Sequence, residues 1–103
     1  MIKFYLSKSN KPNKKLMVQY ISPETNRIRT IHFGAKNYDD YLITNNDKKK
    51  NAYIARHQVR EDFDNYYKPS FYSRWLLWNQ KTLEKSIRDT NKRYPKIKII
   101  NNI

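Results

Sequence analysis

Residues 2–34 read IKFYLSKSNKPNKKLMVQYISPETNRIRTIHFG, and the side-chain pattern of this stretch decides the fold of the N-terminal part. Apolar side chains at Ile2, Phe4 and Leu6 alternate with Lys, Tyr and Ser, and residues 16–20 alternate again, which is the period of a half-buried strand. Turn residues separate the runs. Residues 28–33 are β-branched and aromatic and favour a third strand. We expect a three-stranded antiparallel meander.

Working outward, the only glycine of the chain follows the third run. Gly34 is therefore expected to end that strand in a backbone conformation that other residues avoid. At the other end of the chain, residues 96–100 alternate like a strand, and they would either add an edge strand or trail as a disordered tail.

The second part of the chain shows helical signals. Asp47 is a candidate cap for a first helix that runs to about residue 63. Ser70, which follows a proline, can cap a second helix that runs through residue 79. Asn79 or Thr82 can cap a third helix, which ends before Pro95. The fold class predicted is α+β, an N-terminal antiparallel β-meander of about three strands followed by three helices, with residues 1–95 as one basic domain and 96–103 as a tail or edge strand.

Charge is high and unevenly placed. The 103 residues carry 22 Lys and Arg against nine Asp and Glu, a formal net charge of +13. Residues 1–38 and 65–103 each carry a net +7, whereas residues 39–64 carry −1. Self-repulsion on this scale usually accompanies a polyanionic partner. Nucleic acid is the leading candidate, an acidic protein surface is second, and an anionic membrane is last.

Several function classes find no support in the composition. The absence of Cys excludes disulfides, thiolate metal sites and cysteine nucleophiles. His32 and His57 stand alone in sequence, without metal-ligand spacing. The pair Asp39 and Asp40 is better read as a cap or turn than as a Mg²⁺ site. A nuclease built on this pair with Glu61 and Asp62 ranks a distant third, so we expect no enzyme, no metal and no cofactor.

Basic side chains recur at helical spacing in the third predicted helix. Leu83 and Ile87 occupy a different face there and can pack inward. A basic stripe of this kind can track phosphates, or it can be a solvated face that Glu84 and Asp89 partly neutralise through pairs with residues four positions later. The stripe consists of Lys81, Lys85, Arg88 and Lys92.

A second stripe lies on the first predicted helix, where acidic neighbours favour local ion pairing over phosphate contact. It consists of Lys49, Tyr53, Arg56 and Arg60. Arg27 and Arg29 are predicted to share one face of the third strand, where they either extend a basic surface or solvate the sheet.

The densest apolar segment is FYSRWLLW at residues 71–78. Phe71, Trp75 and Trp78 share one helical face at spacings of four and three. These rings could form a stacking platform for exposed bases. We favour the alternative that this helix anchors the core against the sheet.

Five segments carry a resemblance: HFGAKNYDDY at 32–41 with YIARH at 53–57, and SRWLLWN at 73–79 with Thr-Leu at 82–83 and Ser-Ile at 86–87. Together they resemble a family of small basic proteins encoded by nucleocytoplasmic large DNA viruses, including mimivirus relatives, over roughly residues 31–90. The chain departs from that pattern at Asn37, where Gly is expected, and at Gln80-Lys81, where Lys-Pro is expected. The resemblance implies a viral source and no particular chemistry.

The function predicted is that of a non-enzymatic viral protein associated with nucleic acid, DNA before RNA, which binds the phosphate backbone by charge without strong sequence readout. The alternative is a structural virion module, in the minor capsid or core, that docks on acidic proteins. No membrane partner is expected, because no apolar run approaches the length of a span. The expected location is intracellular, in host cytoplasm or a viral factory, and packaging in the virion stays open.

Overall fold

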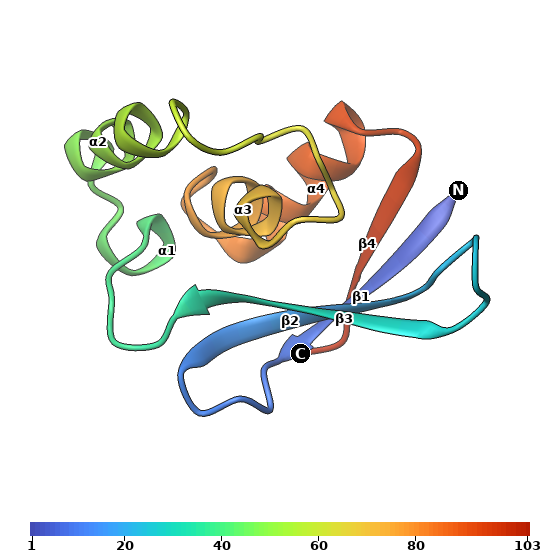
Figure 1. Ribbon diagram of the computed structural model, residues 1–103. Helices are drawn as coiled ribbons and strands as arrows, with labels where there is room; N and C mark the ends of the chain where they lie inside the picture. The colour runs from blue at the N-terminus through green and yellow to red at the C-terminus, as the bar shows by residue number, and fades with distance from the viewer.

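A computed structural model describes all 103 residues as a four-stranded sheet beneath a layer of helices (Figure 1). The elements in chain order are β1 (Ile2–Lys8), β2 (Lys14–Ile21), β3 (Ile28–Ala35), α1 (Tyr41–Thr44), α2 (Asp47–His57), α3 (Pro69–Tyr72), the π-helix η1 (Ser73–Leu77), α4 (Leu83–Arg93) and β4 (Ile97–Asn101). The strand order is β3-β2-β1-β4. The predicted α+β class and the antiparallel meander of β1 to β3 are confirmed.

The C-terminal segment forms β4, which pairs in parallel with β1 at the edge of the sheet. Ile97 and Ile99 are buried under the helices. The outer side of β4 is covered at Ile99 by the side chain of Asn91 in α4, which accepts a hydrogen bond from the Ile99 N–H (2.7 Å) and donates one to its carbonyl (3.1 Å). Residues 97–101 are therefore part of the folded sheet.

The first predicted helix is shorter than expected, and a short helix precedes it. Asn46, not Asp47, is the N-cap of α2, and its side chain accepts a hydrogen bond from the N–H of Lys49. The helix ends at His57 instead of residue 63. After it, Asp62 and Asn65 each accept a hydrogen bond from the N–H two residues later. Such local bonds compete with helical ones and keep this stretch non-helical.

The second predicted helix begins differently and changes its hydrogen bonding midway. Lys68 is the N-cap of α3 without a side-chain bond, so the prediction that Ser70 caps it is wrong. Pro69 takes the first helical position, where its missing N–H costs nothing. From Ser73 the chain continues as η1, and the N–H of Trp78 reaches back five residues to the carbonyl of Ser73 (3.0 Å).

The third predicted helix is α4, and Thr82 is its cap. The hydroxyl of Thr82 accepts a hydrogen bond from the N–H of Lys85 (3.2 Å). The buried side of the helix presents Ser86, Ile87 and Thr90 to the rest of the protein. The hydroxyl of Thr90 donates to the carbonyl of Ser86 (2.7 Å) within the helix.

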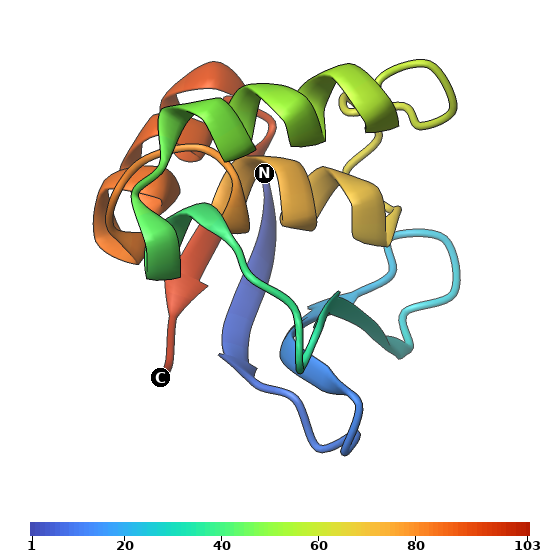
Figure 2. The same ribbon diagram turned by 90° about the vertical axis from the view of Figure 1, so that its left-hand side faces the viewer.

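One face of the sheet and the helix layer enclose the core. Buried strand residues alternate along β1 as Phe4 and Leu6 and along β3 as Ile31 and Phe33. At one end, α2 lies above α3 and η1, which lie above the sheet (Figure 2). The predicted role of the aromatic segment in the core is confirmed, because Phe71, Trp75, Leu76, Leu77 and Trp78 are all buried.

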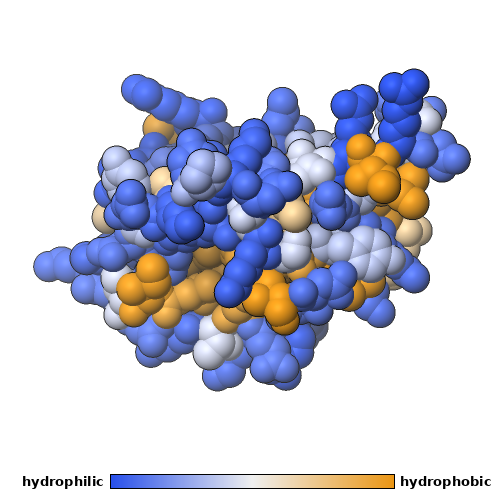
Figure 3. Space-filling model, turned by 90° about the horizontal axis from the view of Figure 1, so that it is seen from below, coloured by the Kyte–Doolittle hydropathy of each residue, from blue (hydrophilic) through white to orange (hydrophobic).

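The opposite face of the sheet has no helices on it (Figure 1). Seen from that side, apolar side chains form a band between hydrophilic ones (Figure 3). None of the nine acidic residues lies in a strand, whereas the strands hold six lysines and arginines. Lys3 and Lys98 are register partners on β1 and β4, so two like charges are neighbours there.

Candidate functional site

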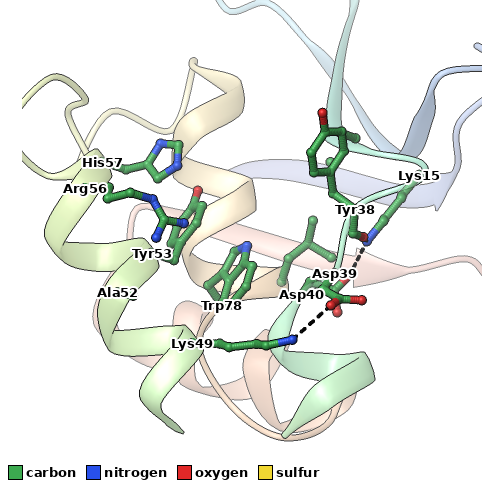
Figure 4. A pocket seen from close by; sticks show the side chains of 13 residues that line it. Lys15, Tyr38, Asp39, Asp40, Lys49, Ala52, Tyr53, Arg56, His57 and Trp78 are labelled. Carbon is green, nitrogen blue, oxygen red and sulfur yellow. Dashed lines mark hydrogen bonds and ion pairs between the residues drawn. The ribbon is translucent and has the colours of Figure 1, made fainter. Parts of the chain in front are cut away.

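A cleft of about 660 Å³ opens between α2 and the connection from β3 to α1 (Figure 4). Its floor is apolar and includes Leu77 and Trp78 of the η1 region. Polar and charged side chains line the two walls. Those of α2 are Lys49, Arg56 and His57, and those of the opposite wall are Lys15, Tyr38, Asp39 and Asp40.

An aromatic stack forms the α2 side of the cleft. The ring of Tyr53 lies 4.6 Å from that of Trp78 at 6° from parallel, and 4.2 Å from that of His57 at 27°. Tyr53 and His57 are four residues apart and so share one face of α2. Burial, followed by the negative charge of Glu61, raises the pKa of Tyr53 to about 12. The phenol is therefore neutral in the stack at physiological pH.

The π-helical turn places Trp78 at the cleft. Turns of this type are rare and often occur at functional sites. The Trp75 indole N–H donates to the carbonyl of Phe63 (2.7 Å), whereas the Trp78 indole N–H has no acceptor in the protein. Oε2 of Glu61 is the only enclosed side-chain N or O atom that has no hydrogen-bond partner. Since the Trp78 nitrogen also has no partner, it cannot be enclosed, and it is open to the cleft.

A buried ion pair holds the wall opposite α2. Asp40 is the N-cap of α1 and accepts a hydrogen bond from the N–H of Ile43 (3.0 Å), as the cap interpretation of the acidic pair predicts. Its other oxygen accepts a hydrogen bond from Lys15 Nζ (2.6 Å), and Lys15 also donates to the carbonyl of Tyr38 (2.6 Å). The charge of Asp40 is thereby cancelled within the fold.

Gly34 lets β3 approach η1 at the base of this wall. Its φ is +79°, which confirms the expected unusual conformation, although β3 continues one residue further, to Ala35. A Cβ at this position would come within 2.7 Å of Cδ1 of Leu77, which is itself buried. Only glycine meets both conditions without strain.

The mouth of the cleft has one weak ion pair and one free cation. Lys49 Nζ lies 3.1 Å from Oδ2 of Asp39, and both side chains are about half exposed. Such surface pairs contribute little, about 0–1 kcal/mol. Arg56 points from α2 into the cleft and has no carboxylate within 4.0 Å (Figure 4). Because the two Lys–Asp pairs cancel, Arg56 leaves the cleft positive.

The stripe predicted on the third helix is found in part. Lys85, Arg88 and Lys92 are exposed, in α4, and free of ion pairs. Lys81 precedes the helix, so its predicted place on the helix is wrong, although it is exposed beside the cap. Of the two expected supporting pairs, Asp89 binds Arg93 (2.8 Å), whereas Glu84 leaves Arg88 free.

The stripe predicted on the first helix does not form as a unit. Lys49 and Arg56 both line the cleft. Tyr53 is buried in the stack instead of facing solvent. Arg60 lies beyond the end of α2 and does not reach the cleft.

Of the two arginines predicted in the third strand, only Arg29 lies in it. Arg27 precedes β3, so it does not share a strand face with Arg29. Arg29 is the register partner of Tyr20 and lines a hollow of about 420 Å³ beside the turn between β2 and β3.

The protein neutralises few of its cations. Among the 22 Lys and Arg side chains, only Lys15, Lys49 and Arg93 lie within 4.0 Å of a carboxylate. The cationic charge is thus available to a partner over most of the surface.

Sequence reasoning missed the cleft itself. The sequence pattern predicts no role for Lys15 or Tyr38, and for Trp78 it favours a place in the core over a stacking platform. The available signal was the glycine before the Asp39–Asp40 pair, which marks a turn where a wall can form. No group of three or more His, Asp or Glu side chains comes together in the structure. None of the helices combines the length and hydropathy required to cross a membrane.

One protein-family model, described as a family of unknown function (DUF5754), matches residues 4–57. The matched segment runs from β1 to the end of α2 and includes all the cleft-lining residues except Leu77 and Trp78. No curated protein and no solved structure shows a significant match. The family description names no activity and no source, so the viral resemblance stays a prediction.

Proposed function

The chain belongs to the family of unknown function DUF5754, and we propose that it is a non-enzymatic protein that binds nucleic acid through the phosphate backbone, with little sequence readout. Phosphate contacts supply most of the affinity in binding of this kind and have no sequence information of their own.

The observation on which the proposal rests is the exposed face of α4. Lys85, Arg88 and Lys92 follow one another at single-turn spacing, and none has a carboxylate partner. At about 1.5 Å per residue, the seven steps from Lys85 to Lys92 span about 10 Å. One strand of a duplex advances about 3.4 Å per phosphate, so the three cations can meet about three consecutive phosphates.

The fold supports this surface from below. Ser86, Ile87 and Thr90 pack α4 inward, and Asn91 attaches it to β4, which leaves the opposite side of the helix to solvent. A rigid helix pre-organises its cations and lowers the entropy lost when they bind. Lys81 adds a fourth charge at the start of the helix.

A direct test compares duplex DNA with an acidic polypeptide such as polyglutamate across a series of salt concentrations. The proposal expects the duplex to bind more tightly at every salt concentration, with comparable affinity for unrelated sequences. Stronger binding to the polypeptide would favour the second candidate, a structural module that docks on acidic proteins. Strong preference for one DNA sequence would contradict backbone recognition.

A further inference from the structure

The cleft beside α2 has hydrogen-bond donors that the fold does not use. Trp78 is 9% exposed, yet its indole N–H opens into the cleft without an acceptor. The guanidinium of Arg56 points into the same space and has no carboxylate partner. The nitrogen is open to the cleft although most of the residue is buried, so a ligand in the cleft that accepts a hydrogen bond would give this donor a partner.

Arg56 is the charged side chain of the cleft that lacks a partner of opposite sign, which favours an anionic ligand. The Asp40 carboxylate is occupied by Lys15 and by the N–H of Ile43. The Asp39 carboxylate is held by Lys49 at the mouth. An anion in the cleft would accept hydrogen bonds from Arg56 and from the Trp78 N–H. It would also compete with Asp39 for Lys49, because that surface pair is weak.

The size and lining of the cleft define the ligand further. Its volume of about 660 Å³ falls within the range of about 300–1,000 Å³ that is usual for small-molecule sites. Tyr38, which is 73% exposed, lies on the wall opposite α2 and offers a ring to a flat group. The cleft thus combines cationic donors with an aromatic rim.

We propose that this cleft binds one phosphate-bearing nucleotide unit. Arg56 and the Trp78 N–H hold the phosphate oxygens, and the base lies toward Tyr38. The inference deepens the proposed function, on which it rests where the nucleotide belongs to a nucleic-acid strand. A free mononucleotide presents the same chemistry, and the experiment separates the two sources.

The experiment measures binding of adenosine 5′-monophosphate to the full chain by calorimetry, with adenosine as the ligand that lacks phosphate. We expect the monophosphate to bind and adenosine to bind about tenfold or more weakly. Arg56→Gln should weaken binding of the monophosphate by about tenfold. The matched control Arg60→Gln removes the same charge outside the cleft and should change binding by less than about twofold.

A third variant tests the sign of the charge that the cleft selects. Asp39→Asn removes the competing carboxylate and frees Lys49, so binding of the monophosphate should tighten by about threefold. Weaker binding in this variant would mean that the cleft selects a cation, and the proposal would be wrong. Circular dichroism checks that the exposed-residue variants remain folded.

A competition experiment between the monophosphate and a nucleic-acid strand identifies the source of the nucleotide. A short single-stranded oligothymidylate that displaces the monophosphate, and that loses affinity in Arg56→Gln, identifies a strand as the source. Monophosphate binding without displacement identifies a free nucleotide, and either result supports the cleft assignment. Equal effects of Arg56→Gln and Arg60→Gln, equal binding of adenosine, or no binding of the monophosphate would overturn it. Duplex binding by α4 is measured in a separate experiment, so a failure of the proposed function can be distinguished from a failure of the cleft assignment.

Discussion

Tyr53 of α2 stacks on Trp78 at the end of η1 with their rings 4.6 Å apart and 6° from parallel. The two residues are 25 positions apart in sequence, and their contact attaches α2 to the helix that lies on the sheet. The same contact forms one side of the cleft. Stability and the proposed binding site therefore depend on one pair of rings.

Removing the Tyr53 ring should destabilise the fold. Tyr53→Ala should lower the free energy of unfolding by about 3 kcal/mol, because large-to-small changes of buried aromatics lose packing and leave a cavity. Tyr53→Phe retains the stack and should cost about 1 kcal/mol or less. Urea denaturation measures both values. An Ala variant as stable as the parent protein would show that α2 does not depend on this stack.

The two tryptophans should differ in their access to anions. Trp75 is buried and its N–H is bonded to Phe63, whereas Trp78 opens into a positive cleft. Iodide should quench the fluorescence of a Trp75→Phe protein, which retains only Trp78, more strongly than that of a Trp78→Phe protein. Acrylamide, which is neutral, should show a difference in the same direction, because Arg74 and Arg93 place cations over the Trp75 ring as well. Equal iodide quenching of the two variants would contradict the orientation of Trp78.

Gly34 should resist substitution. Gly34→Ala places a side chain at a φ of +79° and against buried Leu77, and it should cost about 1–3 kcal/mol of stability. The neighbouring Ala35→Gly is a control that changes backbone freedom without a steric conflict, and it should cost about 1 kcal/mol or less. Thermal melting compares them. If the two variants melt at the same temperature, β3 does not approach η1 as closely as the structure shows.

Asp89 should contribute to stability except in acid. Burial opposes its ionised form, but hydrogen bonds from Asn79 and Arg93 outweigh burial and hold the pKa of its carboxyl below the usual 3.8. Its stabilising effect is therefore complete above the pKa of the unfolded chain and is lost as pH falls through the lower folded value. In Asp89→Asn, the free energy of unfolding should therefore fall less steeply as the pH drops below about 4. An unchanged acid limb in this variant would rule out that linkage.

The sequence predicts those parts of the fold that local periodicity specifies. Alternation along β1 to β3 predicts the meander, and Thr82 marks the start of α4, because both signals lie within a few residues. The parallel pairing of β4 with β1 joins the two ends of the chain and leaves no local pattern. The four residues of α1 are too few for a helical period, and only the Asp40 cap indicates them.

The candidate site was harder to predict, because three separate segments build it. Lys15, Asp40 and Arg56 come together only after β2, the turn beyond β3 and α2 have packed. A period of 3.6 assigns Trp78 to the buried face, which is correct, but the π-helical turn that directs its N–H into the cleft does not follow from that period. The exposed cations of α4 were predictable, because in an amphipathic helix the spacing of residues in the sequence alone assigns each side chain to the exposed or the buried face.

The most direct test of the proposed function is the salt dependence of duplex binding in two charge-matched double variants. Lys85→Ala with Lys92→Ala removes two cations from the exposed face of α4. Lys11→Ala with Lys36→Ala removes two exposed cations outside that helix. Lys15 is excluded from the control, because it holds Asp40 in the fold.

The logarithm of the binding constant should fall linearly with the logarithm of salt concentration, with a slope of about −0.9 per phosphate contacted. The α4 variant should flatten that slope by about two and weaken binding equally for unrelated sequences, while the control variant should retain the parent slope. Equal loss of affinity and slope in the two variants would mean that binding follows total charge, and it would contradict a nucleic-acid surface on α4.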